Sequence, residues 1–363
     1  MASLLRITVA AIGVVVWARA ADLPSWDAKN AAKYLDSRAA WWSSWPRAAR
    51  DHDTFCVSCH TALPYALGRP ALRTASGETQ PAGPEQQILL NIRKRVEMWS
   101  EVQPFYNDAQ HGAGKSTEAR ATEAVMEAVI LTSYDQRSGQ FTEQSRQALD
   151  HMLAVQISSG DNAGSWTWLN FHNQPWEAPD SWFWGAALGA AALGNAPQQY
   201  RSQPKVREDI ALLCEYFARQ ERSQPLLNRL GLLWASTRLP GILSADRKNN
   251  IVQEALSKQR EDGGWSASSL IDPEWKRRDS TPAEIGSDGY ATAWTAYVLE
   301  AAGLRPTSPE IIRALGWLSA HQDKETGRIP AESLNKRRDP ATEPALFMSD
   351  AATAYAALAF NPR

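Results

Sequence analysis

The chain has 363 residues, with 38 basic and 40 acidic side chains and a formal net charge of −2. This near-neutral balance argues against a protein that binds nucleic acid or an anionic membrane surface. Tryptophan is unusually abundant, with 16 copies, and its large ring suits both packed cores and ligand pockets.

The first twenty residues have the pattern of a secretory signal peptide. Arg6 supplies a positive charge, residues 7–17 form a short apolar stretch, and residues 18–20 (Ala-Arg-Ala) form a small-x-small cleavage site. The apolar stretch is too short to span a bilayer comfortably. The sequence therefore predicts a signal peptide over 1–20, a periplasmic or secreted mature protein, and no transmembrane span.

Residues 55–60 read Phe-Cys-Val-Ser-Cys-His, which contains the C-x-x-C-H pattern of c-type haem attachment. In this pattern two thiols add to the porphyrin vinyl groups, and the histidine becomes an axial ligand of the iron. Such a motif is typical of c-type cytochromes. We therefore expect one covalent haem c, bound through Cys56 and Cys59, with His60 as the proximal iron ligand.

Two other interpretations of this motif are a redox-active C-x-x-C pair and half of a zinc site. A redox pair lies near a βαβ unit, and a structural zinc site needs a second close pair of ligands. The sequence shows neither pattern, and export favours haem c. The third cysteine, Cys214, shares a helical spacing with apolar residues and is expected in the core.

The rest of the chain predicts helices of two alternating kinds and almost no strands. Amphipathic segments with a charged face cover 26–42, 85–100, 141–156, 204–220, 244–259 and 308–321. Segments that are apolar or small nearly all round cover 61–72, 118–133, 181–194, 226–237, 288–302 and 350–360. A helix that is apolar all round must be covered on every side. The alternation predicts an all-α fold, an α/α toroid of about six outer–inner helix pairs.

The C-terminal half of the chain also contains an internal repeat. Residues 262–303 and 326–360 both run through Ser-Leu, Lys-Arg-Arg-Asp and Ser-Asp into a helix rich in Ala, Thr and Tyr, and 163–194 is a looser copy. Three outer helices end in a glutamine followed by a glycine-containing turn, which in the first two carries a tryptophan: Gln156, Gln259 and Gln322.

These turns resemble the QW repeats of the squalene/hopene cyclase and prenyltransferase toroids, over most of residues 85–363. The resemblance implies a ring of helices with a substrate cavity at the end where the inner helices begin. Similar turns occur in α/α-toroid polysaccharide lyases. The D-x-D-D acid motif of the cyclases is absent, so proton-initiated cyclisation is not expected.

We expect residues 21–363 to form one haem-bearing toroid; the alternative is a cytochrome c-like unit over 21–110 followed by a toroid over 111–363. In the first layout the haem motif lies in a loop at the mouth of the ring. Other loops at that end supply candidate distal iron ligands, namely His111, His172 and Met348.

Two Lys-Arg-Arg runs fall at the same end of the ring. Guanidinium groups bind carboxylates well, so these runs are candidate partners for the haem propionates. The residues concerned are Arg277, Arg278, Arg337 and Arg338. Single acids at the expected starts of inner helices, Asp180, Asp288 and Asp350, are interpreted as helix caps.

The sequence leaves three functions open. The favoured one is a haem-dependent oxidoreductase acting on a hydrophobic, terpenoid-like small molecule in the toroid cavity. The first alternative is a periplasmic electron-transfer cytochrome whose toroid docks a redox partner protein. The second alternative is a polysaccharide-active toroid, which requires two convergent carboxylates.

Overall fold

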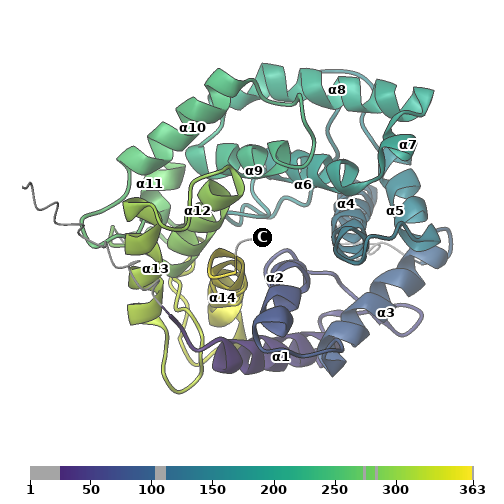
Figure 1. Ribbon diagram of the computed structural model, residues 1–363. Coiled ribbons are helices and arrows are strands. Elements are labelled where there is room, and N and C mark those ends of the chain that lie inside the picture. Colours follow the sequence, from purple (N-terminus) through teal and green to yellow (C-terminus); the bar gives the residue numbers. More distant parts are fainter. Residues whose placement is uncertain (1–24, 103–111, 273–274, 283–284, 362–363) are drawn as a thin grey trace, which may run out of the picture.

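The computed structural model describes residues 25–102, 112–272, 275–282 and 285–361 (Figure 1). The predicted signal peptide and the distal candidate His111 lie outside these ranges. None of the helices within them is long and apolar enough to cross a membrane.

The fold is all-α, and its helices form two concentric rings (Figure 1). The outer helices are α1 (Ala28–Ser44), α3 (Gly83–Glu97), α5 (Glu143–Ala154), α8 (Pro204–Gln220), α10 (Ala245–Ser257) and α13 (Pro309–His321). The inner helices are α2 (Ala62–Ala75), α4 (Gly112–Ser138), α6 (Ser181–Asn195), α9 (Leu226–Ser236), α12 (Gly289–Ala301) and α14 (Phe347–Ala359). Shorter elements are α7 (Gln198–Arg201), α11 (Ala267–Ile271), the 3-10 turns η1 (Glu221–Ser223) and η2 (Glu343–Leu346), and the strands β1 (Ala49–Arg50) and β2 (Thr54–Phe55).

The inner ring closes on itself. Its neighbours in order are α2, α4, α6, α9, α12 and α14, and α14 packs back against α2. The inner helices α6, α12 and α14 are buried along nearly their whole length, whereas the outer helices bury one face. The predicted α/α toroid is thus confirmed, because helices without a polar face can be covered only between an outer layer and one another.

A repeated glutamine contact joins successive outer helices. The Nε2 group of Gln156 donates to the carbonyls of Gly164 and Asp209, and Gln259 binds those of Gly263 and Glu310 in the same way. In each case the second carbonyl lies at or near the start of the next outer helix in the ring. The glutamines at these turns therefore hold the outer ring together.

Gln322 makes the equivalent contact across the ends of the chain. Its Nε2 donates to the Gly327 and Asp27 carbonyls, and its Oε1 accepts from the Asp27 N–H at 2.7 Å. Since Asp27 is the N-cap of α1, the last outer helix is tied to the first. This third repeat, the weakest in sequence, closes the ring.

The interior of the ring is packed with aromatic side chains. Trp294 on α12 contacts Trp184 on α6, which is not its neighbour in the ring, and also Tyr355 on α14, with ring centroids 5.3 and 4.7 Å apart. Trp168 lies so close to α6 that a Cβ at Gly185 would be 2.2 Å from its Cε3 atom. The tryptophans therefore fill the bore, the central channel of the helix ring, and separate its two openings.

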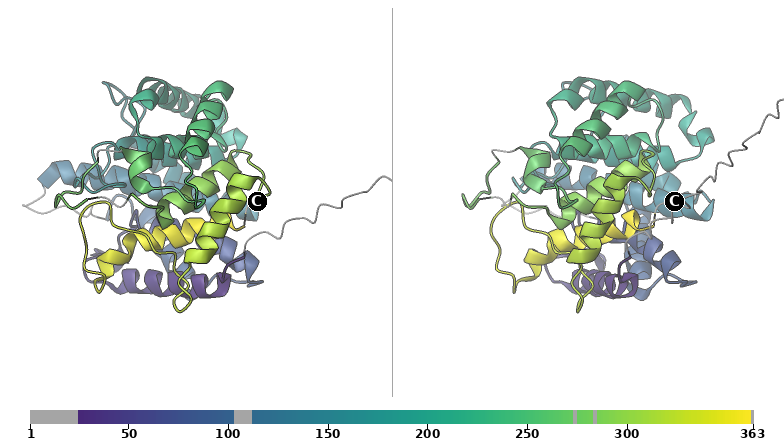
Figure 2. Two further views of the ribbon diagram at one scale, coloured as in Figure 1. Left: turned by 90° about the vertical axis from the view of Figure 1, so that its left-hand side faces the viewer. Right: turned by 60° about the vertical axis from the view of Figure 1, so that its left-hand side comes forward.

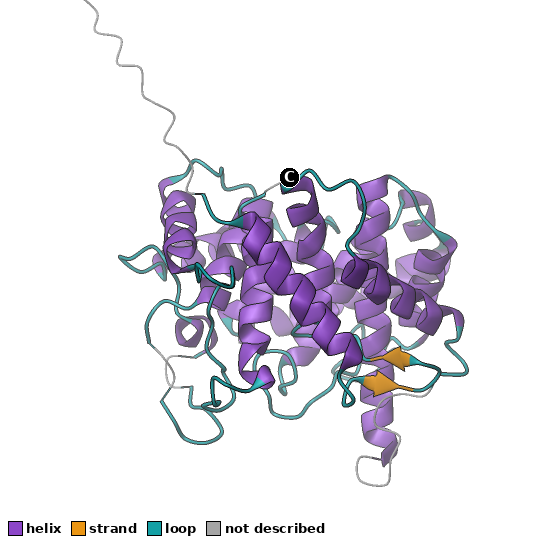
Figure 3. Cartoon of the chain, turned by 90° about the horizontal axis from the view of Figure 1, so that it is seen from below, coloured by secondary structure: helices purple, strands orange, loops and turns teal. Residues whose placement is uncertain are grey.

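The two ends of the ring differ. In the side views the α1 helix runs along one edge of the molecule and α8 and α10 along the opposite edge, with the inner helices between them (Figure 2). The β1–β2 hairpin lies at the end where the inner helices begin, and α14 finishes at the opposite end (Figure 3). We call the first the mouth and the second the far end.

The acids expected to cap inner helices behave differently from one another. Asp288 accepts from the N–H groups of Tyr290 and Ala291, so it caps α12 as predicted. Asp180 precedes α6 but binds the Asn228 amide instead of capping. The prediction is wrong for Asp350, because α14 begins earlier, at Phe347.

Candidate functional site

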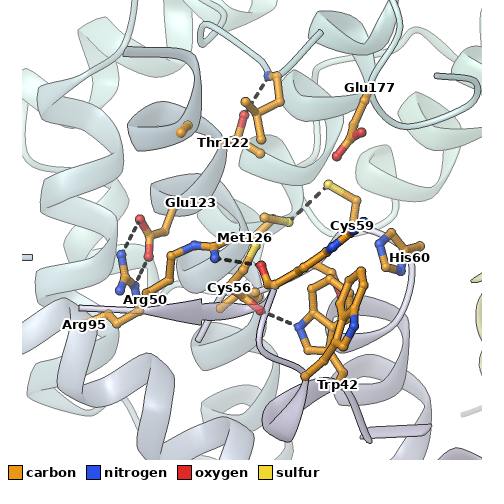
Figure 4. A pocket seen from close by; sticks show the side chains of 16 residues that line it. Trp42, Arg50, Cys56, Cys59, His60, Arg95, Thr122, Glu123, Met126 and Glu177 are labelled. Atoms are coloured by element: carbon orange, nitrogen blue, oxygen red, sulfur yellow. Dashed lines mark hydrogen bonds and ion pairs between the residues drawn. The ribbon is translucent and has the colours of Figure 1, made fainter. Parts of the chain in front are cut away.

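A pocket at the mouth contains all three residues of the haem motif. Its cavity of about 240 Å³ is lined by Cys56, Cys59 and His60, together with side chains from α1, α3, α4 and the loop before α6 (Figure 4). We call it the thiol pocket; the rest of its lining is Trp42, Trp45, Arg47, Arg50, Val57, Ser58, Arg95, Ala119, Thr122, Glu123, Met126, Leu169 and Glu177. The predicted motif residues are thus brought together inside a pocket and not on an open surface.

The motif loop is held by contacts to α1 and α3. The amide of Asn91 on α3 donates to the Phe55 carbonyl and accepts from the Phe55 N–H, at 2.9 and 2.8 Å. Trp42 Nε1 on α1 donates to the Cys56 carbonyl at 2.7 Å. Ser58 then accepts from the N–H groups that open α2. The two thiols are therefore presented on a fixed turn.

His60 is half-buried, and its imidazole is neutral. Its ring stacks on Phe347 at 3.6 Å between centroids and meets the edge of Trp42 at 4.9 Å. Burial lowers the pKa of His60 to about 3, with a further contribution from the Arg38 charge. A neutral imidazole with a free nitrogen lone pair is the form that binds a metal ion.

A hydrogen-bond relay determines which nitrogen of His60 is free. The Thr61 hydroxyl donates to Asp350 Oδ2 at 2.7 Å, so the 2.9 Å contact between Thr61 Oγ1 and His60 Nδ1 must have the histidine as donor. The proton thus lies on Nδ1, and Nε2 keeps its lone pair. A partner of this kind on the second nitrogen is typical of histidines that ligate metals.

Asp350 is a fully buried carboxylate with three side-chain donors. Its Oδ1 accepts from Tyr34 and from Arg38 Nε, both at 2.8 Å, and its Oδ2 accepts from Thr61. Burial raises the pKa of Asp350, while the Arg38 charge lowers it. Asp350 therefore joins α1, α2 and α14 beneath His60, a role that its sequence pattern did not indicate.

Both thiols of the motif are free; Cys59 is buried, whereas Cys56 is half-buried. Burial raises the pKa of Cys56 and, more strongly, that of Cys59. The sulfur of Met126 on α4 lies 3.7 Å from Cys59 Sγ. Cys214, expected in the core, is half-buried on α8 and packs against the core from its edge.

Two carboxylates also line the thiol pocket, on opposite sides of it (Figure 4). Glu123 forms an ion pair with Arg95. Burial raises the pKa of Glu177, whose closest partner is the Asn173 amide at 3.4 Å. One acid is thus paired with an arginine, and burial favours the neutral form of the other.

A smaller side cavity of about 100 Å³ lies next to the thiol pocket and shares Cys59, His60 and Glu177 with it. Met348, a predicted distal ligand, lines this side cavity together with Trp176. His172, another candidate, is exposed on its loop and lines neither space. The thioether of the thiol pocket belongs to Met126, a residue that the sequence analysis did not single out.

The four predicted propionate partners are scattered. Arg277 is buried and donates to the carbonyls of Ser333 and Pro282, so it fastens two loops together. Arg278 is exposed and donates to the Phe171 carbonyl, and Arg337 is also exposed. Arg338 alone lines a cavity with His60.

The arginines that do line the thiol pocket come from the hairpin and α3 rather than from the Lys-Arg-Arg runs. They are Arg47, Arg50 and Arg95. Sequence reasoning missed them because they are isolated in the chain, and only the packing of α3 against the hairpin gathers them.

No family model and no curated protein matches this sequence. Solved structures match the fold. A wild-type glycosidase superimposes with a TM-score of 0.51 and 13% identity, over 92% of this chain and 98% of that one. A glycosidase variant in complex with glucose gives 0.50, also at 13% identity and with the same coverage. At this identity the likeness establishes the fold, an α/α toroid.

The predicted haem-dependent oxidoreductase acting on a terpenoid-like molecule is wrong. The solved rings that match are glycosidases, and the bore that was expected to hold a hydrophobic substrate is filled by tryptophan and tyrosine rings. The described residues also contain no group of three or more His, Cys, Asp or Glu side chains able to hold a metal ion by themselves. The general prediction of a metal-binding oxidoreductase is corrected accordingly.

Proposed function

We propose that this chain carries one haem c, attached through Cys56 and Cys59 with His60 as an axial ligand of the iron. The observation that carries the proposal is the thiol pocket itself, which both cysteines and the histidine line together. A coincidental C-x-x-C-H sequence on a surface loop has no reason to enclose a pocket.

Three features of the thiol pocket fit a haem. Its walls are largely apolar, with Trp42, Val57 and Leu169 among them, and it opens beside a side cavity that shares His60. The tautomer of His60 leaves Nε2 for the iron. Arginines at its edge, Arg47 and Arg50, supply positive charge of the kind that propionates require.

Bound haem would supply a one-electron redox centre, and its porphyrin provides four of the iron ligands, so a single protein histidine is enough to hold it. Of the three predicted distal ligands, Met348 is the one among the described residues that shares a cavity with His60. We also propose, from the N-terminal sequence, that attachment follows export and that residues 21–363 act as one unit.

The test is expression with the signal peptide and a c-type cytochrome maturation system. We expect haem staining that survives a denaturing gel in the wild type and in Cys214→Ala, and that disappears in Cys59→Ala. An intact mass equal to that of the bare polypeptide would refute haem attachment. Limited proteolysis of the same sample should release no stable fragment of about 90 residues from the N-terminal side.

A second candidate function is action on a carbohydrate. It is favoured by the glycosidases of the same fold and by two acids of the thiol pocket: burial raises the pKa of Glu177, and Glu123 is paired with Arg95. A glycosidase needs a protonated acid and an ionised carboxylate facing one bond. In that case the haem and the carbohydrate would both bind at the mouth of the ring.

Hydrolysis of aryl glycosides and of glucose oligosaccharides tests this second candidate. We expect activity in the wild type that falls at least about a hundredfold in Glu177→Gln, the loss typical of a missing general acid. Cys59→Ala separates the two candidates, because it removes a haem-attachment thiol and leaves Glu177 in place. This variant should keep hydrolysis while losing haem. No turnover of any tested glycoside by the wild type would reject the carbohydrate-active function.

A further inference from the structure

A second cavity lies at the far end of the ring, remote from the thiol pocket. It has a volume of about 480 Å³ and is built from inner helices α2, α4, α9, α12 and α14, near their C-terminal ends. Its polar lining includes Arg137, Arg238, Tyr297, Glu300 and Asn361. We call it the Glu300 cavity. None of these residues belongs to the thiol pocket, so the Glu300 cavity is independent of the proposed function.

Glu300 is the unusual member of this lining. Both of its carboxylate oxygens are buried, and neither has a hydrogen-bond partner among the described residues. The desolvation that follows from burial raises the pKa of Glu300 to about 8. A buried acid without partners lowers the stability of the folded chain unless a ligand satisfies it.

The nearby arginines are already engaged elsewhere. Arg238 lies over the Trp234 ring at 4.3 Å and donates to the Tyr297 hydroxyl at 3.1 Å. Arg137 donates to the Leu67 carbonyl at 3.2 Å. Neither guanidinium forms an ion pair with Glu300 within 4.0 Å, although both line the same cavity. Glu300 thus faces the cavity without a counter-charge from these two arginines.

The position of Glu300 in its helix adds to this imbalance. It lies in the last turn of α12, where the unpaired carbonyl groups carry partial negative charge. An acid is disfavoured at a helix C-terminus, and a cation is favoured there. The charge pattern around Glu300 therefore matches a positively charged ligand better than it serves the stability of the fold.

We propose that the Glu300 cavity binds a small molecule with one primary ammonium group, whose N–H groups donate to the Glu300 carboxylate. Leu67, Leu358 and the Trp234 ring provide apolar surface for its carbon skeleton. Arg137 and Arg238 disfavour a second positive charge, so the ligand is a monoamine rather than a polyamine. Hydroxyl groups on the same skeleton would find acceptors and donors in Gln136 and Asn361.

Two matched pairs of probes test the ammonium group directly: glucosamine with glucose, and butylamine with butanol. Calorimetric titration at neutral pH, where the ammonium must also displace the proton of Glu300, should show each amine binding at least about tenfold more tightly than its neutral counterpart. Glu300→Gln keeps the size and polarity of the side chain but cannot ionise, and it should abolish this preference. Glu325→Gln, an exposed acid outside the cavity, should leave it intact.

Each contrary result overturns the proposal. Equal affinity of the amine and its neutral partner would show that the charge is not recognised, and an unchanged preference in Glu300→Gln would place binding elsewhere. Failure of both amines to bind would refute the site. Above pH 8, where Glu300 is ionised, the unliganded Glu300→Gln variant should also unfold at a higher temperature than the wild type, because it removes an unpartnered buried charge; a lower temperature would contradict that premise.

Discussion

The hydroxyl of Thr61 donates to Oδ2 of Asp350 at 2.7 Å, across 289 positions of the chain. Thr61 immediately follows the C-x-x-C-H motif, whereas Asp350 belongs to the last helix. The orientation of His60 therefore depends on a residue that lies near the opposite terminus. Because the contact is buried, neither partner can exchange it for water without a loss of stability.

Thr61→Val should break this relay while preserving the shape of the side chain. His60 Nδ1 and Asp350 each lose a partner, so we expect the free energy of unfolding to fall by about 1–3 kcal/mol. In haem-loaded protein the reduction potential should shift as well, because the imidazole loses its second hydrogen bond. Thr74→Val, at the exposed end of the same helix, is the control. Equal effects of the two substitutions would argue against the relay.

Gln322→Ala should open the seam between α13 and α1. The side chain makes three hydrogen bonds, two of them to Asp27 and one to Gly327. Loss of these bonds predicts a decrease of about 1–3 kcal/mol in the free energy of unfolding, measured by urea denaturation. Gln86→Ala removes one exposed contact to a carbonyl and should change it by less than about 0.5 kcal/mol. Equal free energies of unfolding for the two variants would show that the contacts of Gln322 do not stabilise the ring.

Gly185→Ala should overpack the bore. The added Cβ would lie 2.2 Å from Cε3 of Trp168, which is buried and cannot move aside. Overpacking of this kind typically lowers the free energy of unfolding by about 1–3 kcal/mol. Gly114→Ala, in the first turn of α4 with open space around it, should raise it slightly. Thermal unfolding of both variants checks the contrast, and a neutral Gly185→Ala would mean that α6 can shift.

Asp288→Asn should flatten the pH dependence of stability between about pH 4 and 6. Burial raises the pKa of Asp288 from 3.8 to about 6 in the folded chain. The protonated form is therefore favoured by folding, and this contribution is complete below pH 3.8 and lost as the pH rises to about 6. The loss is of the order of 3 kcal/mol for a shift of this size.

Urea denaturation at several pH values measures this slope in the wild type and in Asp288→Asn. The exposed Asp279 has its pKa lowered by a hydrogen bond from Thr281, so its effect on stability lies below pH 3.8. Asp279→Asn should accordingly leave the slope between pH 4 and 6 as it is in the wild type. A wild-type curve without a slope in this window would disprove the assignment to Asp288.

The helix pairs could be predicted from sequence because their signal is local. Burial on all sides requires a helix without a polar face, and the segments around Trp184 and Tyr355 show this directly in their composition. The motif loop at the mouth could be predicted for the same reason, since it lies between the first outer and the first inner helix. Each of these inferences depends on neighbours within about twenty residues.

The features that sequence reasoning missed depend on distant parts of the chain. Asp350 has the pattern of a helix cap, yet its donors Tyr34 and Arg38 approach from the first helix. Arg277 belongs to a basic run that suggests an exposed anion site. Instead, its buried guanidinium donates to the carbonyls of Ser333 and Pro282 and joins two loops. Glu300 gives no signal at all in sequence, because only packing removes it from water.

The burial of Cys59 has a consequence for the order of events during biogenesis. The sulfur is enclosed by α4 on one side, and beyond His60 by α14, a helix that is synthesised long after the motif. A thiol that is both buried and held in its protonated form reacts slowly. Any enzyme that modifies Cys59 must therefore reach it while α14 is still undocked, so the time between synthesis of the motif and closure of the ring limits how much of the protein is modified.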